Sequence, residues 1–106
     1  MQEWNVITLV SYENTGAQDD YGDDVLSEVR KNVYAECRSI GQTEFYQAQT
    51  AGFKPEIKFV LTTSRDYDGQ EEIIFSGIRY KVLKTYIPQN DSIEITCYGG
   101  VRDASS

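Results

Sequence analysis

The sequence contains no histidine, so a Ser-His or Cys-His nucleophile pair cannot be built from it. It has only two cysteines, Cys37 and Cys97, without the close spacing of a metal site. Both lie in alternating apolar patterns, which predicts buried free thiols; a disulfide would require the fold to pair their strands. Gly99-Gly100 lacks the Lys-Ser/Thr of a phosphate-binding loop. We therefore expect that the chain is not an enzyme and that it binds no cofactor.

Long apolar runs are also missing. No stretch approaches the roughly 20 residues of a membrane span, and Met1 to Asn5 has neither the basic nor the apolar part of a signal peptide. With 106 residues, of which 40% are hydrophobic, the chain predicts a single domain over 1–106 that has no membrane partner.

Positive charge is absent from residues 1–24, which carry most of the net charge of −7. Because affinity for a phosphate backbone comes from Lys and Arg, we expect no sequence-specific binding of nucleic acid. The acidic residues 13–24 predict a solvated loop. Its Asp19-Asp20-X-X-Asp23-Asp24 pattern offers oxygen ligands for calcium, but the spacing does not match an EF-hand loop.

Period-two alternation of apolar residues predicts an all-β chain. A short helix is expected over Thr43–Gly52, since Phe45, Ala48 and Gly52 recur at helical spacing. The tail from Val101 is expected to fray. About six strands and one helix favour a small antiparallel β-barrel, which leaves no exposed sheet edge. The expected strands are Trp4–Val10, Val29–Ser39, Glu56–Thr63, Ile73–Phe75, Ile78–Tyr86 and Ile93–Tyr98.

The order of several short motifs adds a family resemblance that covers Ile7 to about Tyr98. A Glu-Phe-Tyr-X-Ala stretch is followed by a glycine, a proline, a Tyr-Asp-Gly turn and an X-Gly-X-X-Tyr hairpin. Here these residues are Glu44, Phe45, Tyr46, Ala48, Gly52, Pro55, Asp68, Gly69, Gly77 and Tyr80. In this order and spacing the chain resembles the head-closure proteins of long-tailed bacteriophages, also called head-tail adaptors or stoppers.

The resemblance implies a virion structural protein, made in the host cytoplasm or encoded by a prophage. Such proteins form a ring, usually dodecameric, below the portal and its adaptor, and they dock the tail or its completion protein. Double-stranded DNA passes through the ring. The segment from about Gly41 to Glu56 would project into the channel as a plug, or its helix would simply cover the barrel. The candidate channel residues are Gln42, Glu44, Gln47, Gln49, Thr50 and Lys54.

Two alternatives stay open at this stage. A tail-completion or tail-terminator subunit is also small, acidic and β-rich. A ligand-binding barrel of the OB type would need aromatic and basic residues on one strand face. Tyr80, Lys84 and Tyr86 share such a face by parity, whereas Lys81 points the other way.

Overall fold

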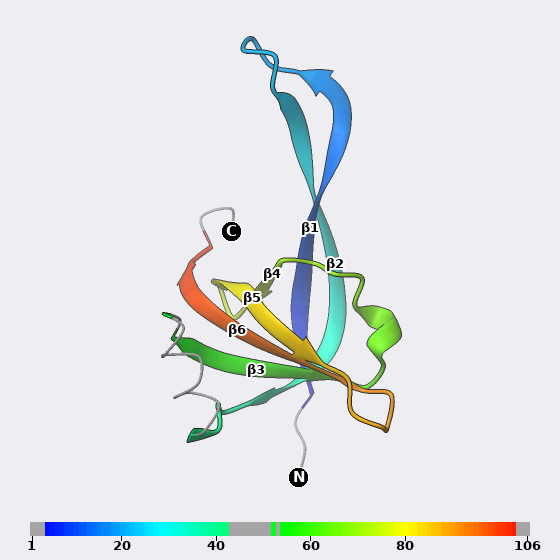
Figure 1. Cartoon of the computed structure of the whole chain (residues 1–106), viewed down its shortest axis with the longest axis vertical. Coiled ribbons are helices and arrows are strands. Elements are labelled where there is room, and N and C mark those ends of the chain that lie inside the picture. The colour runs from blue at the N-terminus through cyan, green and yellow to red at the C-terminus, as the bar shows by residue number, and fades with distance from the viewer. Residues whose placement is uncertain (1–3, 43–51, 53, 104–106) are drawn as a thin grey trace.

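A computed structural model of the chain describes residues 4–42, 52 and 54–103. The molecule is a closed six-stranded antiparallel barrel from which one long two-stranded hairpin projects (Figure 1). The strands are β1 (Asn5–Gln18), β2 (Asp24–Arg38), β3 (Pro55–Leu61), β4 (Glu72–Phe75), β5 (Ile78–Tyr86) and β6 (Ile93–Arg102). The structure also has a 3-10 turn, η1 (Ser64–Asp66), which was not expected from the sequence.

Around the barrel the order of the strands is β1-β2-β3-β6-β5-β4, and β4 pairs with β1 to close the ring. This closing seam is short, since it joins only Thr8–Val10 to Glu72–Ile74. The expected hairpin around Ser76-Gly77 is confirmed, with Phe75 opposite Ile78. The prediction of a small antiparallel barrel is therefore confirmed.

Inward-facing residues from every strand fill the barrel. The largest side chains without exposed surface include Phe59, Ile7, Leu9 and Leu61. Phe59 makes edge-to-face contacts with Phe75 and Tyr80, with ring centroids 5.6 and 6.0 Å apart. Such pairs contribute about 0.5–1.5 kcal/mol beyond the area that they bury. The interior is thus a packed core and not a ligand cavity.

Within the barrel, the first strand has apolar side chains on both faces, but only its inner face has all of them buried. Ile7 and Leu9 are fully buried, but Val6 keeps 54% of its surface exposed and lies directly opposite the exposed Tyr34 of β2. Val10 is buried on the outer side. Apolar residues on both faces of a strand therefore do not show that both faces are buried, because some of them lie exposed on the outer wall of the barrel.

The predicted solvated loop over 13–24 is right about exposure and about the turn at residues 19–23, but it is wrong for residues 13–18, which are part of β1. β1 and β2 continue past the barrel as an antiparallel ribbon, with Asn14 opposite Leu26 and Gln18 opposite Asp24. No alternation of buried and exposed residues marks such a ribbon in the sequence, because all of its residues from Glu13 to Ser27 are exposed. Its turn is closed by the Asp19 carboxylate, which accepts hydrogen bonds from the backbone of Tyr21 and Asp23.

Other boundaries also shift. β3 ends at Leu61 and not at Thr63, and β6 continues to Arg102, where a frayed tail was expected. Asp68-Gly69 does not join paired strands, because β3 and β4 are not neighbours in the barrel, although Gly69 is left-handed with φ of +82°. The helix expected over Thr43–Gly52 lies outside the described residues, except for Gly52 itself.

Candidate functional site

The hairpin beyond the barrel, residues 11–28, is the most prominent feature of the surface, and we call it the arm. Figure 1 shows it running away from β3 and β6, with its tip far from the rest of the chain. The molecule is 49 Å long but only 30 and 27 Å across. Extended strands rise about 3.3 Å per residue, so residues 12–18 alone span roughly 20 Å.

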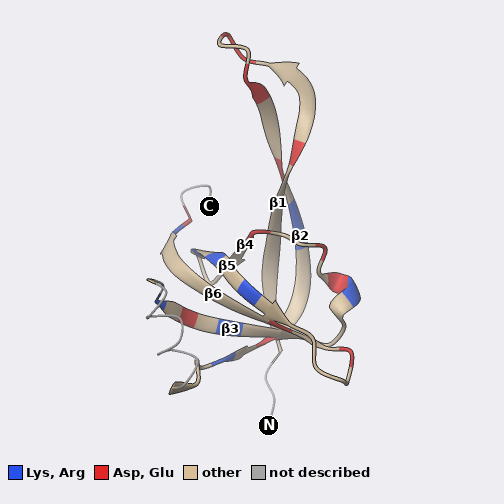
Figure 2. Ribbon diagram, in the orientation of Figure 1, with Lys and Arg blue, Asp and Glu red and all other residues tan. Residues whose placement is uncertain are grey.

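The arm is acidic, as the red segments at its tip and along its strands show in Figure 2. It contains no Lys or Arg, and its acids are Glu13, Asp19, Asp20, Asp23, Asp24 and Glu28. Four larger apolar side chains accompany them, namely Tyr12, Tyr21, Val25 and Leu26, of which Tyr21 at the tip is 91% exposed. The arm therefore combines negative charge with an exposed aromatic ring.

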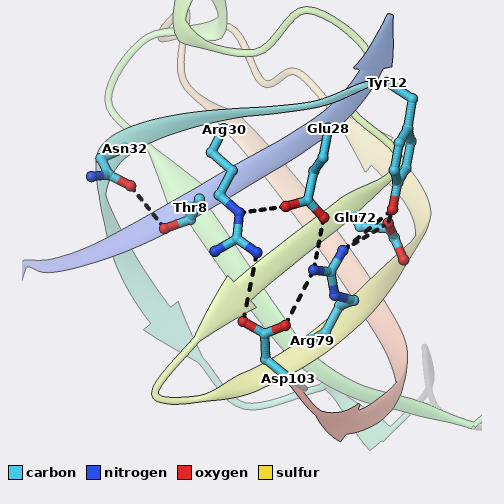
Figure 3. Close-up of polar contacts among 8 residues, drawn as sticks. All are labelled: Thr8, Tyr12, Glu28, Arg30, Asn32, Glu72, Arg79 and Asp103. Carbon is cyan, nitrogen blue, oxygen red and sulfur yellow. Dashed lines mark hydrogen bonds and ion pairs between the residues drawn. The ribbon is translucent and has the colours of Figure 1, made fainter. Parts of the chain in front are cut away.

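A network of ion pairs fixes the base of the arm to the barrel (Figure 3). Arg79 of β5 lies at its centre and donates to Glu28 of β2 at 2.9 Å, and to Glu72 of β4 and Asp103 at 3.2 Å each. The Tyr12 hydroxyl of β1 also donates to Glu72. Two hairpins, β1-β2 and β4-β5, and the residue after β6 are thus joined around one guanidinium.

Arg30 completes this network, which we call the anchor. Its guanidinium pairs with Glu28 and lies 3.9 Å from Asp103, whose side chain is only 3% exposed. Asp103 is further held by its backbone N–H, which donates to Gly77 at 2.9 Å. The residue that follows β6 is therefore buried between two arginines, and the arm and the C-terminal end of β6 are locked to each other.

The anchor changes the proton affinities of its members. Burial alone would lower the pKa of Arg79, but its hydrogen bonds to Glu28 and Asp103 outweigh burial and raise the pKa above its ordinary value. The hydrogen bonds from Arg30 and Arg79 lower the pKa of Glu28 below 4.5. The hydrogen bond to Glu72 raises the pKa of Tyr12. All these shifts favour the charge states that hold the network together at neutral pH.

Two grooves lie on the barrel wall near residues singled out by the sequence. One, of about 560 Å³, runs beneath the arm and is lined by Tyr12, Glu71, Glu72, Lys81, Val82 and Tyr98. The other, of about 310 Å³, crosses β3, β6 and β5, and we call it the basic groove. It is lined by Lys58, Lys84, Thr85, Tyr86, Glu94 and Thr96.

The face expected for an OB-type barrel is not formed. Tyr80 packs against the core beside Phe59, whereas Lys84 and Tyr86 are exposed on the outer wall. Parity fails because the pairing of β5 with β6 shifts between Val82 and Lys84, which moves the later residues to the other face. The three residues therefore do not form one binding platform.

The candidate channel segment is described only at its ends. Gln42 and Lys54 are exposed, and Glu44, Gln47, Gln49 and Thr50 lie outside the described residues. The same holds for the motif residues Glu44, Phe45, Tyr46 and Ala48. The structure therefore leaves the plug a prediction.

The remaining motif residues have recognisable local roles. Gly52, Gly69 and Gly77 have φ of +89°, +82° and +79°, which suits the glycines expected in turns. Pro55 begins β3 and is buried, Asp68 lies 3.9 Å from Lys31, and Tyr80 packs in the core. These roles are structural, and they do not bring the motif together as one site.

Cys97 is buried and Cys37 is half-buried, and both are free thiols. They lie on non-neighbouring strands, β2 and β6, on either side of β3. Burial raises the pKa of both, to about 12 for Cys97. Within the described ranges, no group of three or more Cys, Asp or Glu side chains is placed to hold a metal ion, and no helix is long and apolar enough to cross a membrane.

The sequence matches no protein-family model and no curated protein.

Proposed function

We propose that the chain is a structural subunit at the head-tail junction of a long-tailed bacteriophage, which closes the DNA-filled head below the portal and its adaptor. The observation that carries this proposal is the closed barrel with a projecting arm. Side chains such as Phe59 and Leu61 fill the interior of the barrel, so this proposal places the contacts with other proteins on the outer surface. An assembling subunit needs this arrangement, a rigid body with an extension that reaches a neighbour.

Assembly into a ring follows from simple physical considerations. The arm and the barrel wall are different surfaces, so a contact between them is head-to-tail and generates a ring when the rotation closes. One such contact is weak, but ring closure makes each further contact at high effective concentration. We expect the isolated protein to be mostly monomeric and the ring, dodecameric in the virion, to form on the adaptor. Sedimentation of the purified protein as a stable ring would contradict this.

DNA passing through the ring must not adhere to its wall. A net charge of −7 opposes tight contact with phosphates. The channel segment 41–56 has a single Lys, Lys54, and no Arg, so a lumen lined by its amides and acids would let double-stranded DNA slide. The tail or its completion protein would then dock on the opposite end of the ring.

Electron microscopy of particles made without this protein tests the proposal. We expect full heads that leak DNA and carry no tails, and expression of the intact chain in trans should restore tailed particles. Normal tailed particles would refute the proposal. Heads that keep their DNA beside tails of uncontrolled length would instead assign the chain to the end of the tail.

A variant with a shortened arm, in which Asn14–Leu26 is replaced by Asn-Gly, tests the role of the arm, and the intact chain is its control. The flanking pair Glu13 and Ser27 stays in register, and a two-residue Asn-Gly turn suits a hairpin. Because the barrel core contains no residue of the arm, this variant should fold. If it fails to restore tailed particles although the intact chain does, assembly depends on the arm.

A further inference from the structure

We infer that the arm of one copy of this chain binds in the basic groove of a second copy. This inference rests on the proposed function, because it specifies which surfaces of neighbouring subunits meet in the ring. It starts from the unusual exposure of the arm. A two-stranded ribbon is marginally stable by itself in water, and here every residue from Glu13 to Ser27 is exposed.

The backbone of the arm is exposed as well. Within the described residues, β4 covers β1 only over Thr8–Val10, and β3 covers β2 only over Glu36–Arg38. The outer edges of both arm strands therefore present backbone donors and acceptors that no neighbouring strand pairs. Such edges are templates for contact with another chain.

A second copy offers two surfaces to the arm, its own arm and its basic groove, and their charges favour the groove. An arm that paired with another arm would bring six carboxylates against six more, and like charges at close range oppose binding. The basic groove carries Lys58 and Lys84 against one acid, Glu94, which lies 3.3 Å from Lys58. Two lysines against one glutamate leave the lining of the groove with a net charge of +1, which is opposite in sign to that of the arm.

The groove is also built for an aromatic residue. Lys58 and Lys84 both stand opposite Thr96, from the strands on either side of it, and Thr96 is only 2% exposed. The exposed ring of Tyr86 forms one wall. Tyr21 at the tip of the arm is 91% exposed, and a tyrosine is well suited to anchor an interface between cations and a second ring.

The direction and length of the arm require that it contacts the groove of another molecule. The arm leads away from β3 and β6 (Figure 1), so its tip cannot fold back to the groove of its own barrel. The extension of roughly 20 Å is enough to cover most of the width of an adjacent barrel. Figure 2 shows the acidic tip of the arm at the top, well separated from the blue segments of β3 and β5 in the barrel. This separation suits a head-to-tail contact that repeats around a ring.

Photocrosslinking of the full chain tests this inference without any phage. The photoreactive residue p-benzoylphenylalanine replaces Tyr21, and the protein is irradiated at low salt at about 1 mM, comparable to the effective concentration within an assembly. We expect a covalent dimer whose crosslinked peptides include the strands around Lys58, Lys84 or Tyr86. The same residue placed at Arg65, on the exposed η1 turn, should give no such peptides.

A charge variant strengthens the test. Lys84→Glu should lower the yield of the dimer about threefold to tenfold, and so should moderate salt, because both weaken an exposed electrostatic contact. Arg65→Glu, a matched reversal outside the groove, should leave the yield unchanged. Absence of the dimer, crosslinks from arm to arm, or crosslinks to another face would overturn the inference.

The two proposals fail separately. Crosslinks in the groove together with normal tailed particles in the deletion experiment would refute the phage function alone. Tailless particles together with a dimer linked elsewhere would refute the contact between arm and groove alone.

Discussion

Replacement of Arg79 by methionine should destabilise the protein more than any other removal of a surface charge. Methionine keeps most of the length of the side chain but removes hydrogen bonds to Glu28, Glu72 and Asp103. Glu28 and Glu72 are partly exposed, at 29% and 18%, and recover hydration. Asp103, at 3% exposure, would keep only the longer contact with Arg30 among those described above.

The magnitude follows from this uneven exposure. Removing one partner of a buried ion pair costs about 3–5 kcal/mol, because the other charge stays buried. Only one of the three carboxylates is deeply buried here, so the lower end applies, about 3 kcal/mol. Arg79→Lys keeps the charge but loses the forked geometry, and should cost about half as much.

Urea denaturation followed by circular dichroism measures this loss. Arg38→Met is the matched control, because Arg38 also pairs with a glutamate at 2.9 Å but is 44% exposed. Exposed pairs contribute about 0–1 kcal/mol. If the two variants differ by less than about 0.5 kcal/mol, the anchor does not stabilise the fold as described. The double variant Arg79→Met with Asp103→Asn should lose less free energy of unfolding than the two single variants lose together.

Three further predictions concern other parts of the molecule. Folding lowers the pKa of Glu28. The ionised Glu28 carboxylate therefore stabilises the fold above pH 4.5, and this contribution is lost as the pH falls through the folded pKa. Glu28→Gln should flatten the pH dependence of the urea midpoint in that range. An added methyl at Gly100 would lie 2.7 Å from Tyr80 Cε1, so Gly100→Ala should cost about 1–3 kcal/mol in the same assay, and an unchanged midpoint would contradict the packing. A thiol reagent at about pH 8 should modify Cys97 only after unfolding, whereas Cys37 reacts earlier; equal rates would contradict the burial of Cys97.

The barrel could be predicted because its core residues alternate cleanly. Ile93, Ile95 and Cys97 point inward as expected, and so do Val33 and Ala35. The hairpin between β4 and β5 was evident from Ser76-Gly77, where both residues have positive φ. In each case the burial of one face leaves a period-two pattern in the sequence.

The arm and the anchor could not be predicted, for two different reasons. A ribbon exposed on both faces has no apolar alternation, so residues 13–24 were predicted to be a loop. The anchor joins Glu28, Arg79 and Asp103 across 75 residues of sequence, and only the closure of the barrel brings them together. The outward turn of Lys84 depends on an irregular register in β5, which leaves no mark in composition.

The arm grows directly out of the barrel, and this shapes its mechanical behaviour. β1 and β2 each continue as one strand from the buried core into the exposed ribbon, whose register shifts only beyond Asn14, so the same backbone forms both the barrel and the base of the arm. A push at the tip is therefore transmitted as shear along β1 into its short seam with β4, which only three residue pairs hold. In a closed circle of such subunits, movement at one junction would strain the wall of the next.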